Sequence, residues 1–133
     1  MKALFTGIYT LFNAANTFKT AVGGQLYLHE APQDTATYPY SVYTLISELS
    51  DWTFTELTEE SLIQFSIFSE NKSAGEVTDA YTKMKTLFDD AALSVVGFDE
   101  VFMHREFSRL LRDPVTNTWH CSADYRILLE KAR

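Results

Sequence analysis

The chain has 133 residues, of which 46% are hydrophobic and 22% are charged. This length is typical of one domain, since most domains hold about 100–150 residues, and the composition excludes a disordered or low-complexity chain. The formal net charge of −7 disfavours a grip on nucleic-acid phosphates, which requires clustered Lys and Arg. No apolar run approaches the roughly 18 residues of a membrane span.

The N-terminal segment predicts an amphipathic helix over about residues 2–15. Its apolar residues recur at helical spacing: Leu4, Ile8, Leu11, Phe12 and Ala15. Because they are spaced apart and Lys2 is the only basic residue among them, we expect a mature helix and not an export signal. Gly23 and Gly24 then mark a turn.

Three segments then predict strands, at about residues 25–29, 40–49 and 61–69. Alternation divides the large side chains of the second between two faces: Tyr43, Leu45 and Leu49 on one, and Tyr40, Val42, Thr44 and Ile46 on the other. A strand that is apolar on both faces is central in its sheet or covered by a partner. Because the second and third strands are neighbours in the chain, we expect them to form an antiparallel hairpin.

A second amphipathic helix is predicted over about residues 73–91. Ser73 followed by Glu76 matches a capping box at its start. The apolar residues then repeat at intervals of three and four: Val77, Ala80, Tyr81, Met84, Leu87, Phe88 and Ala91. This spacing indicates a helix with one buried face.

Two long strands, at about residues 100–112 and 118–129, follow and enclose a turn at 113–117. Alternation predicts a buried face made of Val101, Met103, Phe107 and Leu111 from the first strand and of Trp119, Cys121, Ala123, Tyr125, Ile127 and Leu129 from the second. The other face of this hairpin is expected to meet water.

The order helix, three strands, helix, two strands is not a repeated βαβ pattern. It predicts one α+β domain over residues 1–133, an antiparallel or mixed β-sheet with both helices packed on one face.

Residues that could carry chemistry are scattered. His29, His104 and His120 belong to three different strands, and a site built from all three stays an alternative. Cys121 is alone, which excludes an intrachain disulfide and fits a reducing compartment, and it should face away from His120 because strand side chains alternate. We therefore predict no catalytic, cofactor-binding or metal-binding residues, and no enzyme.

An acidic connection with aromatic side chains follows the second strand. From Glu48 to Glu60 there are five acids and no base. Aromatic residues in such a connection either fold back onto the core or anchor a partner. We predict interface roles for Trp52, Phe54 and Glu56.

The charges are unevenly distributed along the chain. Residues 1–104 hold fourteen acids and five lysines, a net charge of −9, whereas residues 105–133 hold six bases and four acids, a net charge of +2. This asymmetry suits head-to-tail pairing between copies. Arg105, Arg109 and Arg112 are the predicted complementary interface residues, with Arg105 and Arg109 on one face of their strand and Arg112 on the other.

The order of several short motifs resembles that of the tail-terminator, or tail-completion, proteins of long-tailed (siphovirus-like) phages and prophages. The motifs cover nearly the whole chain: residues 23–27 (GGQLY), 30–32 (EAP), 38–42 (YPYSV), 68–69 (FS), 80–81 (AY), 112–114 (RDP) and 119–120 (WH).

This resemblance implies an antiparallel sheet packed by two helices and a homo-oligomeric ring, a hexamer, on the head-proximal end of the tail tube. Such a ring ends tube polymerisation and offers a joining surface to the head-tail connector protein. Genome DNA passes through its bore without specific binding, and no cofactor or membrane takes part. The protein would be assembled in the cytoplasm of the bacterial host and would reside in the virion tail. The alternatives are a neck or head-tail connector component and a small α+β ligand-binding module.

Overall fold

The computed structural model describes residues 2–14, 16–52 and 57–131. In that part of the chain it has three helices and five strands: α1 (Lys2–Asn13), α2 (Thr17–Ala21), β1 (Leu26–Leu28), β2 (Tyr40–Trp52), β3 (Leu57–Ser69), α3 (Gly75–Phe88), β4 (Phe98–Asp113) and β5 (Thr118–Lys131).

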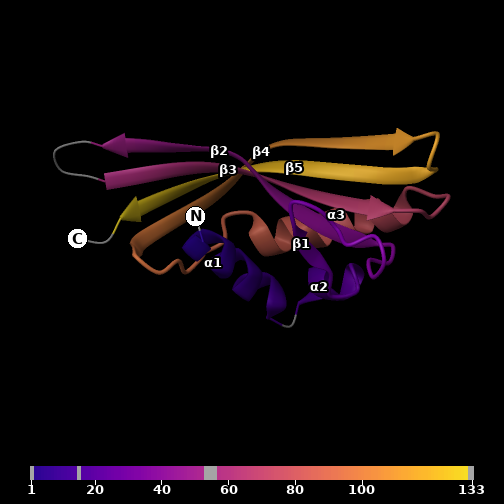
Figure 1. Ribbon diagram of the computed structural model, residues 1–133, viewed down its shortest axis with the longest axis horizontal. Helices are drawn as coiled ribbons and strands as arrows, with labels where there is room; N and C mark the ends of the chain where they lie inside the picture. Colours follow the sequence, from indigo (N-terminus) through magenta and orange to yellow (C-terminus); the bar gives the residue numbers. More distant parts are fainter. Residues whose placement is uncertain (1, 15, 53–56, 132–133) are drawn as a thin grey trace.

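The strands form one mixed sheet in the order β1-β2-β3-β5-β4. β1 runs parallel to β2, and all the other neighbours are antiparallel. The helices lie together on one side of this sheet (Figure 1). We call the side that they cover the inner face and the opposite side the outer face. The predicted α+β class and the β2–β3 hairpin are confirmed.

The core lies between the helices and the inner face, and it is rich in aromatic side chains. Phe65 of β3 stacks on Phe88 of α3 with ring centroids 4.4 Å apart, and Tyr125 of β5 meets Phe65 edge-on. Phe12 and Phe18 continue the cluster into α1 and α2. All five side chains are fully buried. Each such side chain removes roughly 150–250 Å² of apolar surface from water, so this cluster is what holds the helical layer on the sheet.

Two helix predictions need correction. The short helix α2 was not predicted; Asn16 caps it by accepting a hydrogen bond from the Lys19 N–H at 2.7 Å. The predicted capping box of α3 does not form, because Ala74 occupies the N-cap position. Ser73 instead accepts from the Gly75 N–H, and Glu76 accepts from the hydroxyl of another residue, Ser69.

Two β-bulges correct the predicted faces of β2 and β4. The β2 register shifts between Leu45 and Ser47, so Leu49 lies on the outer face opposite Glu60. The extra residue of a bulge resets the alternation of every side chain beyond it. Leu49 therefore does not share a face with Tyr43, as strict alternation had predicted.

The register of β4 shifts between Arg105 and Phe107. Beyond this point Phe107 and Leu111 lie on the outer face, opposite Asp124 and His120, and not on the predicted buried face. The faces of the arginines change as well. Arg105 and Arg112 lie on the inner side, opposite Tyr125 and Trp119, and Arg109 lies on the outer face opposite Ser122.

Candidate interaction surfaces

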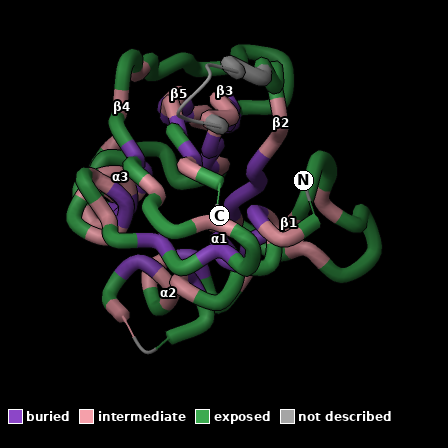
Figure 2. Tube along the Cα trace, turned by 90° about the vertical axis from the view of Figure 1, so that its left-hand side faces the viewer, coloured by how far each residue is buried: buried purple, intermediate pink, exposed green. Residues whose placement is uncertain are grey.

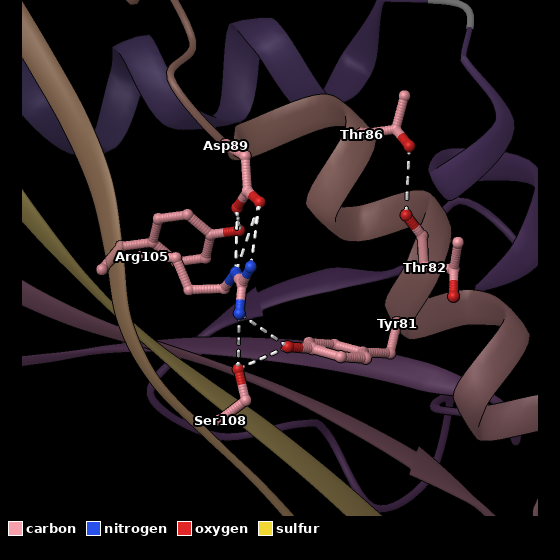
Figure 3. A network of polar contacts seen from close by, with 7 residues as sticks. Tyr81, Thr82, Thr86, Asp89, Arg105 and Ser108 are labelled. Carbon is pink, nitrogen blue, oxygen red and sulfur yellow. Dashed lines mark hydrogen bonds and ion pairs between the residues drawn. The ribbon is translucent and has the colours of Figure 1, made fainter.

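A polar network joins the end of α3 to β4 and β5 (Figure 3). Asp89, the C-cap of α3, accepts from the Arg105 Nε at 3.2 Å and from the Tyr125 hydroxyl. The Arg105 Nη1 also donates to the Tyr81 hydroxyl oxygen at 3.2 Å, and Tyr81 is hydrogen-bonded to Ser108. The guanidinium is thus satisfied within its own chain.

The electrostatics of this network indicate a structural role. Burial, followed by the bond to Asp89, raises the pKa of the Tyr125 hydroxyl well above its ordinary value. The bond to Asp89 raises the pKa of Arg105. About a third of the Arg105 and Asp89 side chains remains in water (33% and 31%), so the pair is partly screened. The predicted interface role of Arg105 stays a prediction, but its charge is already neutralised inside the fold.

The outer face carries large apolar side chains in contact with water. Exposed fractions reach 60% at Leu49, 59% at Phe102 and 56% at Phe107. Two further residues of this face are 43% and 39% exposed: Leu111 and Leu128. Figure 2 shows the same division end-on, with β3 and β5 largely buried in the middle and β4 largely exposed at one edge. Apolar patches of this kind on a folded domain mark interaction sites.

The registers arrange these side chains in rows across the sheet. One row runs from Leu49 through Glu60 and Leu128 to Phe102. Because directly opposed Cβ atoms lie about 4.5–5.5 Å apart, such a row forms a continuous surface. The outer face of the β4–β5 hairpin therefore meets water, as predicted, but at this end it is apolar.

Charges on the outer face are paired near its centre. Arg126 of β5 binds Glu60 of β3 and Glu106 of β4, the second with an Nη2–Oε2 distance of 3.0 Å. The bond to Arg126 lowers the pKa of the Glu106 carboxyl below its ordinary value. Paired charges at the centre of this face, with exposed apolar side chains beside them, resemble the composition of a protein–protein interface.

At the other end of the outer face, the segment that follows β1 encloses a pocket of about 420 Å³. His120 stacks on Phe68 with ring centroids 4.4 Å apart, and Phe68 stacks on Tyr40 at 5.2 Å. Burial, and then the charge of Arg109, lowers the pKa of His120. His29 lines the same pocket.

The third histidine does not join this pocket. His104 lies opposite Arg126 on β5, six positions from His120, or about 20 Å along the strand. Within residues 2–14, 16–52 and 57–131, no group of three or more His, Cys, Asp or Glu residues is placed to hold a metal ion. The structure therefore brings two of the three histidines together.

Cys121 is buried on the inner face, as predicted, with His120 pointing to the outer face. Burial raises the pKa of its thiol to about 11. A thiol with a raised pKa is protonated at neutral pH, and only the thiolate is a strong nucleophile.

Of the other predicted interface residues, the structure describes some in full and leaves others outside the described part of the chain. Trp52 ends β2 and is described only in its backbone, whereas Phe54 and Glu56 lie outside the described residues. Arg109 and Arg112 are exposed, and the Arg112 guanidinium lies 4.9 Å from the centroid of the Trp119 ring. These interface roles stay predictions.

Sequence reasoning missed the apolar outer face. Two of its members were visible, because Phe102 and Leu128 fall on the non-buried side even under strict alternation. The other members required the two bulges, for which no residue type gave a signal.

No protein-family model and no curated protein sequence matches the chain. Among solved structures, the fold is similar to that of a chain from the virion of a native gene transfer agent (GTA) particle, with a TM-score of 0.75 and 14% sequence identity. The match covers 92% of this chain and 91% of that chain. At this identity the likeness establishes the shared fold. No described helix is both long enough and apolar enough to cross a membrane.

Reversing the charge of Arg105 or of Arg109 should show which of the two arginines stabilises the fold. Arg105→Glu places a carboxyl beside Asp89 and should lower the free energy of unfolding by about 1–2 kcal/mol, the cost of a lost partner reduced by partial exposure. The matched control Arg109→Glu changes an exposed residue and should alter it by no more than about 0.5 kcal/mol. Urea unfolding measures both, and equal losses would contradict the structural role of the network.

Proposed function

We propose that this chain is a phage or prophage virion assembly protein that forms a ring on the head-proximal end of a tail tube. The ring would end tube polymerisation and provide the surface to which the head is joined. The observation that carries the proposal is the fold shared with a virion chain over 92% of this chain and 91% of the other. The coverage in both directions means that the two chains are similar in extent as well as in architecture.

The surface properties support an assembly role. The exposed apolar side chains of the outer face, at Leu49, Phe102 and Phe107, suit permanent contact with other proteins. The net charge of −7 suits a ring through which DNA slides, because like charge repels phosphate.

A neck component on the head side is the second candidate, since the fold likeness is to a virion chain and favours neither position. The structure to which the protein binds distinguishes a tail terminator from a neck component. A terminator binds tubes made of tail-tube protein alone, whereas a neck component requires the connector.

Electron microscopy of the purified protein mixed with its tail tubes tests the proposal. We expect ring-shaped density at one end of each tube, and tubes that no longer elongate when more tube protein is added. A species that remains monomeric and leaves elongation unchanged at high concentration would contradict the proposal. Density only on connector-bearing particles would assign the neck position.

We also propose that the function involves no catalysis. The histidines supply a direct test, because two of them share a pocket and the third lies elsewhere. Alanine at His29, His104 and His120 together should leave tube capping intact, with circular dichroism as the control for folding. A triple variant that keeps its fold and loses capping would show that the histidines take part.

A further inference from the structure

The sheet ends in two strand edges that have no partner in the described part of the chain. On one side, β1 pairs with β2 only from Ser41 to Tyr43, so residues 44–52 of β2 have β3 as their single neighbour. On the other side, β4 pairs only with β5. The turn after α3 covers part of the β4 edge, where the Asp90 N–H donates to the Met103 carbonyl at 3.1 Å. Residues 107–112 of β4 lie beyond that cover.

Free edges expose main-chain donors and acceptors and so invite pairing with another chain. Natural edge strands are protected by prolines, by inward-pointing charges or by short length. Residues 107–112 read Phe-Ser-Arg-Leu-Leu-Arg and contain no proline, their one inward-pointing charge is Arg112, and Leu110 and Leu111 are 41% and 43% exposed. This edge is a template for strand addition.

The directions of the strands fit one edge to the other. Three antiparallel steps lead from β2 through β3 and β5 to β4, so β4 runs opposite to β2. A second copy placed beside the first, with its helices on the same side, would set its β2 antiparallel to β4. The sheet would then continue with regular antiparallel hydrogen bonding.

One register of β2 against β4 also sets opposite charges across from each other and apolar side chains across from each other. Glu48 is on the inner face of β2, since it lies opposite Ser61, and Arg112 is on the inner side of β4, opposite Trp119. Setting Glu48 opposite Arg112 places Leu49 opposite Leu111 one position further. Both leucines are exposed on the outer face. Opposite charges and apolar pairs at directly opposed positions each stabilise a strand pair.

We propose that residues 108–112 of β4 in one copy pair antiparallel with residues 48–52 of β2 in a second copy, with Glu48 opposite Arg112 and Leu49 opposite Leu111. This inference rests on the proposed self-assembly and specifies the joint. A pair formed by residues 107–112 of β4 with the same residues of a second copy would instead gather four arginines and no acid along one joint, and like charges disfavour it. The joint is therefore heterologous, the kind that generates rings when the rotation closes.

Cysteine trapping tests this joint. Leu49→Cys and Leu111→Cys in one chain place two thiols that can meet only between copies. Leu111 lies in the row of His120, Phe68 and Tyr40, and Leu49 is nine positions along β2 from Tyr40, or about 30 Å. The buried Cys121 does not compete. The matched control is Leu49→Cys with Phe107→Cys, because Phe107 shares the outer face of β4 with Leu111 but lies four positions from it, or about 13 Å.

Under mild oxidation the Leu49→Cys/Leu111→Cys chain should give a ladder of covalent oligomers on a non-reducing gel, which reductant collapses to monomer. Either single variant should remain monomeric, as should the control pair. A covalent dimer from Leu111→Cys alone, or a double variant that cross-links no more than the control, would overturn the proposed joint.

Tube capping by the same reduced samples distinguishes this failure from that of the proposed function. Chains that cap tubes without cross-linking would show that the joint is wrong and the function stands. Chains that neither cap tubes nor cross-link would show that the proposed function itself is wrong.

Discussion

A sheet has two faces, and the helices of this chain cover only one of them (Figure 1). The central strands β3 and β5 pair without a register shift from Thr58 to Ser69, and their inner side chains form the regular part of the core. The irregularities lie in the flanking strands: β2 has one bulge, after Leu45, and β4 has a register shift after Phe98 and a bulge after Arg105. Beyond both bulges, large apolar side chains turn to the uncovered face, at Leu49 in β2 and at Phe107 in β4.

The bulge in β4 serves both faces at once. Arg105 and Ser108 are three positions apart and would face opposite sides of a regular strand. The extra residue lets both face α3, where both are hydrogen-bonded to Tyr81 and Arg105 also binds Asp89 (Figure 3). The same shift moves Phe107 to the outer face. A polar contact that fixes α3 and an apolar surface that faces water therefore depend on one local irregularity.

The sequence could predict the faces of the regular strands and could not predict those of the strands with bulges. The opposite orientations of His120 and Cys121 were predicted correctly, because β5 alternates regularly along its inner core positions. The arginine faces were predicted wrongly, because Arg105 precedes the bulge in β4 and Arg109 follows it. Bulges depend on how two strands pair, and a single strand carries no periodic signal of that. The helix α2 was missed because five residues are too short a window for helical periodicity.

The account of function reduces to a physical claim: assembly occupies the uncovered face and the free edges of the sheet and leaves the helical layer exposed. Hydrogen–deuterium exchange, compared between the monomer and the assembled form, tests this most directly. Amides in residues 48–52 and 108–112 should exchange more slowly after assembly, because strand pairing and burial protect them, whereas amides of α1 should be unchanged. Protection confined to α1 and α2, with both edges still exchanging freely, would contradict the account.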